Sequence, residues 1–80
     1  MPITMLTARF VAGVKPTPGK RVEYFDRQIP GLALRVMPTG VKTWTLLYRN
    51  KQARLRRLTM GSTAVLTLVQ ARERARDAQR

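Results

Sequence analysis

The chain has 80 residues, of which 44% are hydrophobic, so it is long enough for one small folded domain but not for a large core. It contains no Cys and no His, which excludes disulfides, thiolate or imidazole metal ligands and a histidine base, and we expect no metal or other cofactor. Its 16 Lys and Arg against 4 Asp and Glu give a formal net charge of +12, which is typical of proteins that bind a polyanion such as DNA, RNA or an anionic membrane.

The first 30 residues predict a short helix followed by a linker and a strand. Residues 7–14 are expected to form the helix, with Thr7 as its N-terminal cap. Its core-facing side chains are expected to be Phe10, Val11 and Val14. Residues 15–21 contain two prolines and a glycine, which disfavour regular structure, whereas the aromatic and β-branched residues of 22–26 predict a strand.

The stretch from Gly31 to Gly61 dominates the sequence, because it holds seven basic residues and no acidic one. Apolar and polar side chains alternate along residues 32–37, 43–49 and about 53–60, and a period of two predicts strands that are buried on one side. Turn-forming residues separate these runs, so we expect the hairpins of an antiparallel sheet. The buried side is expected to carry Leu32, Leu34, Val36, Trp44, Leu46, Tyr48, Leu58 and Met60.

The last part of the chain predicts a helix from Thr67 to at least Gln79. Thr67 and Gln70 have the spacing of a capping box, in which each side chain bonds the other residue's backbone N–H. The stripe expected to pack over Trp44, Leu46 and Tyr48 consists of Leu68, Ala71, Ala75 and Ala78. The helix is also expected to present a charged surface that mostly faces solvent, formed by Arg72, Glu73, Arg74, Arg76, Asp77 and Arg80. Pairs such as Glu73–Arg76 and Asp77–Arg80 have a spacing that suits an exposed helix face. The predicted fold is therefore α+β: a three- to four-stranded antiparallel sheet packed on a C-terminal helix, with a short N-terminal helix.

The sequence shows no sign of secretion or membrane insertion. Residues 1–6 lack the basic opening and the long apolar run of a signal peptide, and no segment approaches the roughly 18 apolar residues of a membrane span. We therefore expect a cytoplasmic protein without a membrane partner.

The side of the predicted sheet opposite the apolar residues is cationic and hydroxyl-bearing, and it is the candidate DNA-binding surface. A major groove admits a small sheet, guanidinium groups can bond guanine, and hydroxyl groups can contact phosphate. The candidates on the strands are Arg35, Thr43, Thr45, Arg49, Arg57 and Thr59. Those in or beside the turns, where they could hold the flanking DNA backbones, are Lys42, Lys51, Gln52 and Arg54. Leu47 and Leu55 fall on the same side and could contact either thymine methyl groups or protein.

Other interpretations stay open at this point. The cationic side could simply be the solvated side of an antiparallel sheet. Trp44, Tyr48 and Tyr24 raise the alternative of a small RNA-binding or single-strand-binding module, although the spacing of the first two with Leu46 favours the core. A protein-docking module would use Leu47 and Leu55. Catalysis is not expected, because the four carboxylates are divided between a strand and a helix and form no acid–base constellation.

Four segments in this order, residues 23–36, 42–49, 56–61 and 66–75, resemble a known family. From about Leu6 to Arg76 the chain is similar to the N-terminal arm-type DNA-binding domain of tyrosine-recombinase integrases from prophages and genomic islands. The chain departs from the family in two places. Thr63-Ala64 stands where an aromatic residue followed by proline is common, and Leu47 occupies a position that is often polar.

The resemblance implies a small sheet packed on a C-terminal helix, with the sheet in the major groove of short repeats flanking the recombination core. It implies three kinds of partner: double-stranded DNA, other integrase protomers and host DNA-bending proteins. Residues 1–80 would be a single non-catalytic domain of a longer integrase whose separate C-terminal domain performs strand exchange. The family's exposed strand residues match Arg35, Thr43, Thr45, Arg49 and Arg57.

Overall fold

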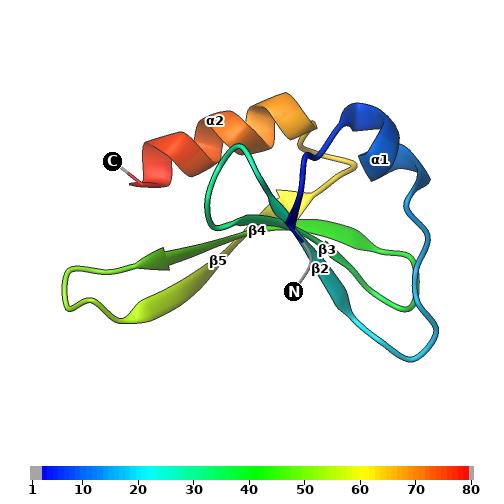
Figure 1. Cartoon of the computed structure of the whole chain (residues 1–80), viewed down its shortest axis with the longest axis horizontal. Helices are drawn as coiled ribbons and strands as arrows, with labels where there is room; N and C mark the ends of the chain where they lie inside the picture. Colours follow the sequence, from blue (N-terminus) through cyan, green and yellow to red (C-terminus); the bar gives the residue numbers. More distant parts are fainter. Residues whose placement is uncertain (1–2, 80) are drawn as a thin grey trace.

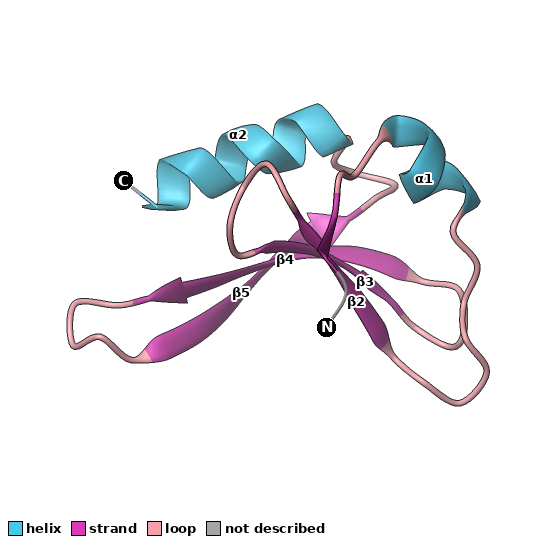
Figure 2. Cartoon of the chain, viewed as in Figure 1, coloured by secondary structure: helices cyan, strands magenta, loops and turns pink. Residues whose placement is uncertain are grey.

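The computed structural model describes residues 3–79. The chain forms a five-stranded sheet with both helices on one of its faces (Figure 1). The elements are β1 (Ile3–Thr4), α1 (Ala8–Gly13), β2 (Val22–Asp26), β3 (Leu32–Val36), β4 (Lys42–Arg49), β5 (Leu55–Ser62) and α2 (Leu68–Gln79). The strands lie in the order β1-β2-β3-β4-β5, and all neighbours are antiparallel except β1 and β2, which are parallel. The predicted α+β fold, with a sheet packed on the C-terminal helix and a short N-terminal helix, is confirmed (Figure 2).

The sheet contains one strand more than predicted, because β1 adds to the edge of β2. Its two residues pair with Phe25 and Asp26. Two residues are too few to show an alternating pattern, so this strand could not be recognised in the sequence. The segment that follows β1 places Leu6 in the core, where it is 1% exposed.

The turn between β4 and β5 is longer than predicted, so β5 begins at Leu55 and not at about Ala53. Ala53 has a φ of 61°, in the left-handed region that few non-glycine residues adopt. The Asn50 side chain accepts hydrogen bonds from the backbone N–H groups of Gln52 and Arg54, each at 3.0 Å. These bonds fix the turn within the hairpin that projects from the body of the molecule (Figure 1).

A β-bulge resets the register near the end of β5. Thr45 pairs with Thr59, but Trp44 pairs with Gly61, so Met60 is an extra residue in β5. Gly61 has a φ of 146°, a conformation that L side chains rarely adopt. With the extra residue accommodated, β5 continues to Ser62 instead of ending at Met60 as predicted.

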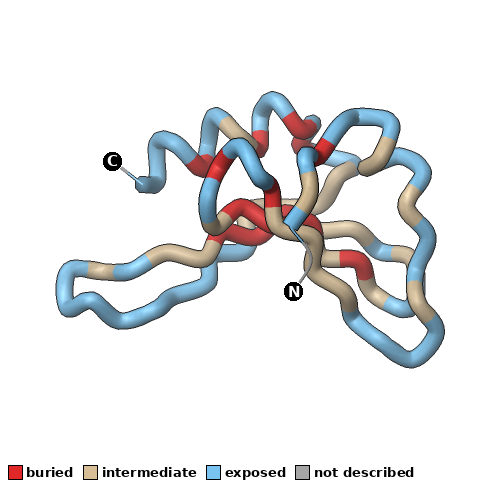
Figure 3. The backbone as a smooth tube through the Cα atoms, in the orientation of Figure 1, coloured by how far each residue is buried: buried red, intermediate tan, exposed pale blue. Residues whose placement is uncertain are grey.

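The core lies between the sheet and α2 (Figure 3). Trp44 is 0% exposed, as predicted, and its Nε1 donates a hydrogen bond to the Leu66 carbonyl oxygen at 2.9 Å. Ala71 and Ala75 are also 0% exposed, and their small side chains let α2 lie close to the sheet. Ala78 was predicted to complete this stripe but is exposed, because a cleft separates α2 from β5 at that end of the helix.

Both predicted helix caps are present. The Thr7 hydroxyl accepts a hydrogen bond from the Phe10 N–H at 3.0 Å. At the start of α2, Thr67 Oγ1 accepts from the Gln70 N–H at 3.2 Å, and Gln70 Oε1 accepts from the Thr67 N–H at 2.9 Å. The predicted core contacts of the first helix are confirmed for Phe10, Val11 and Val14. Within residues 3–79, no helix is long and apolar enough to cross a membrane.

Arg72 does not face solvent as predicted but forms an ion pair with the buried Asp26. Its Nε and Nη2 donate to the two carboxylate oxygens at 2.9 and 3.1 Å, and Nη2 also donates to the Leu6 carbonyl oxygen at 2.9 Å. The Asp26 side chain is 0% exposed and accepts a further bond from the Leu6 N–H at 3.4 Å. This pair ties the segment after β1, strand β2 and helix α2 together. The ion pairs of residues 3–79 do not include Glu73 with Arg76, and Asp77–Arg80 falls outside the described residues.

Candidate nucleic-acid interface

The face of the sheet turned away from the helices is built from alternate residues of β2 to β5. The register places Glu23, Arg35, Thr43 and Ser62 in one row across the strands, and Phe25, Ala33, Thr45 and Thr59 in the next. On β4 and β5 the rows continue as Leu47 with Arg57 and Arg49 with Leu55. We call these residues the open face, because both helices lie on the other side of the sheet (Figure 1).

Six of the predicted DNA-binding residues come together on the open face, namely Arg35, Thr43, Thr45, Arg49, Arg57 and Thr59. They differ in accessibility. Arg49 and Thr59 are exposed, and the side chains of Arg57 and Arg35 are 34% and 18% exposed. Thr45 is only 1% exposed. The alternating pattern therefore placed these residues on the correct side of the sheet, but it did not indicate which of them a ligand could reach.

Lys42 lies on the opposite side of the sheet from the open face. Its Nζ donates hydrogen bonds to the carbonyl oxygens of Val11 and Ala12, at 2.8 and 3.2 Å. These carbonyls belong to the last turn of α1, where a cation is favoured by the unpaired backbone oxygens. The structure thus gives Lys42 a role in holding α1 to the sheet. Its position two residues before the buried Trp44 was a signal that it shares the helix-covered side.

The remaining predicted residues, Lys51, Gln52 and Arg54, lie exposed in the turn of the β4–β5 hairpin (Figure 3). Arg49 supports this turn, since its Nη1 donates to the Ala53 carbonyl oxygen at 3.0 Å. Arg56, which was not among the predicted DNA-binding residues, is also exposed. It pairs with Tyr48 on the helix-covered side of the sheet. The tip of the hairpin is therefore basic on both of its sides.

Glu23 is an open-face residue whose interaction with the candidate arginines was not predicted from the sequence. Its Oε2 accepts hydrogen bonds from Arg35 Nη2, at 3.5 Å, and from Arg57 Nη1, and its side chain is 10% exposed. The composition of residues 31–61 indicates a surface without acidic residues. The open face does contain one, because β2 contributes the carboxylate of Glu23 from outside that stretch. The signal was present in the sequence: a short turn joins the two strands, so alternate residues of 22–26 face alternate residues of 32–36.

The aromatic residues on which the single-strand alternative depends lie on the helix-covered side. Trp44 is fully buried, and Tyr24 and Tyr48 are partly buried against the core. The ring of Tyr24 packs edge-on against Phe10, with 5.2 Å between the ring centroids. The three rings stabilise the fold and are not available as a stacking platform in this arrangement.

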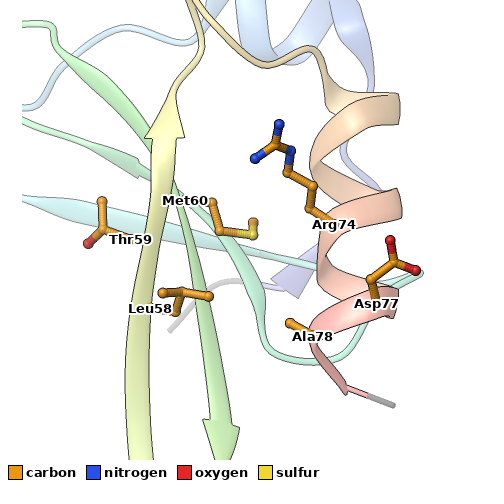
Figure 4. A pocket seen from close by; sticks show the side chains of 6 residues that line it. All are labelled: Leu58, Thr59, Met60, Arg74, Asp77 and Ala78. Atoms are coloured by element: carbon orange, nitrogen blue, oxygen red, sulfur yellow. The ribbon is translucent and has the colours of Figure 1, made fainter.

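A cleft of about 500 Å³ lies on the other side of β5, between this strand and α2 (Figure 4). Its lining residues are Leu58, Thr59, Met60, Arg74, Asp77 and Ala78. In Figure 4 the Met60 and Arg74 side chains point into the gap from opposite elements. In the described part of the chain, no three acidic, histidine or cysteine side chains gather where they could hold a metal ion.

Comparison with known proteins identifies the family of the chain. The family described as "Arm DNA-binding domain" matches residues 6–80, which is nearly the whole chain. Such arm-type domains are found in integrases, where they bind DNA and are not catalytic. A comparison with curated proteins finds no match. From the extent of the family match, we conclude that the chain belongs to the arm DNA-binding domain family.

Proposed function

We propose that this DNA-binding domain inserts the open face of β3, β4 and β5 into the major groove of arm-type repeats, and so positions a tyrosine recombinase during prophage or genomic-island integration and excision. The observation that carries the proposal is the arrangement of Arg35, Arg49 and Arg57 on one sheet face that no helix of the described chain covers. Guanidinium groups on a surface of this shape are suited to bidentate bonds with guanine O6 and N7.

The dimensions of the sheet support this geometry. Neighbouring strands lie about 4.8 Å apart, so the axes of three strands span about 10 Å, and the major groove is about 12 Å wide. β4 and β5 each have 8 residues and end in the projecting basic turn. A ribbon of this width and length can follow the groove while the turn reaches the sugar–phosphate backbone.

The proposed roles follow from the chemistry of each residue. Arg35, Arg49 and Arg57 read base edges, and the hydroxyl groups of Thr43 and Thr59 contact phosphate. The exposed turn residues Lys51, Gln52 and Arg54 hold the neighbouring backbone. Lys42 and Thr45 are left out of the contact set, because the first is bonded to α1 and the second is buried.

The wider context is also part of the proposal. We place the domain in a cytoplasmic integrase, where it tethers protomers to bent DNA together with host DNA-bending proteins. Strand exchange is assigned to a catalytic domain outside residues 1–80. The support for this context is membership of a family of arm-type domains found in integrases.

Loss of individual arginines tests the base-reading role. Selection from randomised duplexes first identifies a preferred sequence, and affinities are then measured for that duplex and for its single-base variants. Arg35→Ala and Arg57→Ala are each expected to lose about 1–3 kcal/mol of discrimination at a particular base pair. Lys51→Ala serves as the matched control, and it is expected to weaken binding to all duplexes alike, because a phosphate contact carries no sequence information. Equal and sequence-independent losses in all three variants would remove the base-reading role.

A further inference from the structure

We propose that Glu23 acts as an internal anion that occupies Arg35 and Arg57 in the DNA-free domain and is displaced when the open face binds DNA. Glu23 thereby limits how tightly the domain binds duplex DNA. This inference rests on the proposed function, since it assumes that the two arginines contact DNA.

The first support is the way in which one carboxylate oxygen serves two strands. Glu23 Oε2 accepts from Arg35, its direct neighbour on β3, and from Arg57, which projects from β5. Two strands, β3 and β4, lie between Glu23 and Arg57. With about 4.8 Å between neighbouring strands, the Arg57 side chain has to lie along the sheet surface to make this contact.

The register shows what the contact passes over. Glu23 is in the row of Arg35 and Thr43, whereas Arg57 is in the row of Leu47, so the straight path between them crosses Ala33 and Thr45. Both of these residues are 1% exposed although they belong to the open face. The contact between Glu23 and Arg57 therefore passes over Ala33 and Thr45, in agreement with their burial, and it holds the Arg57 side chain along the sheet. A guanidinium group that reads bases in a groove has to point away from the sheet instead.

The third support is an unsatisfied donor in the same cluster. Arg35 Nε is buried and has no hydrogen-bond partner. A buried donor without a partner raises the free energy of the arrangement that contains it. The closed cluster is therefore poised to open when a ligand offers acceptors to Arg35, and phosphate oxygens or a guanine edge are acceptors of this kind.

A double-mutant cycle measures this competition. Glu23→Gln keeps the size of the side chain and removes its charge, and it is expected to tighten binding to the preferred duplex about tenfold, because DNA no longer has to displace a charged competitor. The same substitution in an Arg35→Ala/Arg57→Ala background is expected to change affinity about twofold at most, since there is no ion pair left to open. Glu73→Gln on α2 makes the same change in net charge away from the open face and is the matched control for general electrostatic attraction.

The outcomes separate this inference from the proposed function. If Glu23→Gln gives equal gains with and without the two arginines, the carboxylate repels DNA without competing for the arginines, and the inference is wrong. If Arg35→Ala and Arg57→Ala leave affinity and base preference unchanged, the proposed function itself fails. The carboxyl ¹³C resonance of Glu23 in the unmutated protein gives a second readout: it should shift when the preferred duplex is added, and an unchanged resonance in the bound state would overturn the proposal.

Discussion

Asp26→Ala is expected to lower the free energy of unfolding by about 3–5 kcal/mol, which is a large part of the stability of a small domain. The Asp26 carboxylate is buried and receives two bonds from Arg72 and one from the Leu6 N–H. Its removal leaves the guanidinium group of Arg72, whose side chain is only 15% exposed, without its counter-charge. Denaturant unfolding can be followed through the fluorescence of Trp44, the single tryptophan of the chain.

The control for this experiment is Glu73→Ala, which removes an acid from the exposed side of α2 and should change stability by less than about 0.5 kcal/mol. The double variant Asp26→Ala/Arg72→Ala should lose less than the sum of the two single variants, because each single variant already breaks the pair. A loss of less than about 1 kcal/mol for Asp26→Ala would show that the pair does not hold α2 to the sheet.

The same pair predicts how stability responds to acid. Burial alone would raise the pKa of Asp26, but the hydrogen bonds from Arg72 and from the backbone, together with the charge of Arg72, outweigh this effect and hold the pKa below its ordinary value of 3.8. A carboxyl group with a lowered pKa in the folded state contributes stability above its unfolded pKa. That contribution is lost as the pH falls below 3.8 and through the lowered value. Asp26→Asn should lack this part of the acid-induced loss.

The affinity for duplex DNA is expected to fall about a thousandfold between 50 and 200 mM salt, provided that about six basic side chains, at base edges or at phosphates, replace counterions on the duplex. Each contact releases counterions from the DNA, so six contacts give a log–log slope near −5. Six cations are available: the open face supplies Arg35, Arg49 and Arg57, and the hairpin supplies Lys51, Arg54 and Arg56. Fluorescence anisotropy of a labelled duplex, titrated at several salt concentrations, measures the slope.

A matched pair of variants locates the contacts. Lys51→Ala, in the hairpin turn, should reduce the steepness of the slope by about 1, whereas Arg76→Ala, on the exposed side of α2, should leave it unchanged. A slope near zero would exclude the electrostatic account altogether. A reduced slope for Arg76→Ala and an unchanged slope for Lys51→Ala would show that DNA binds on the side of α2, and this would contradict the proposed interface.

Much of the fold could be predicted from local patterns. The alternation along β3 and β4 identified Trp44 and Leu46 as core residues, and the spacing of Thr67 and Gln70 predicted the cap of α2. These features depend on neighbours in sequence, so they can be read directly. β1 and the bulge at Met60 could not be predicted, because each depends on hydrogen bonding to another strand, and the local sequence pattern does not show it.

The electrostatic partners were the harder part of the prediction. Lys42, Arg72 and Glu23 all have the charged side chains typical of exposed positions, and in the structure each of them finds a partner at least 12 residues away in sequence. A long charged side chain can reach either water or a distant acceptor, and the local pattern is the same in both cases. The sheet face that carries the candidate residues was therefore predictable, whereas the ion pairs that its arginines form were not.

The proposal that the open face enters the DNA is tested most directly by mapping the bound surface. Amide and arginine side-chain NMR resonances of the labelled domain would be recorded while an unlabelled duplex is added. The largest shifts are expected on the open face, at Thr43, Thr59 and the arginines Arg35, Arg49 and Arg57, and on the turn from Asn50 to Arg54. Shifts concentrated on α2, around Arg74 and Arg76, with the open face unchanged, would contradict the proposal.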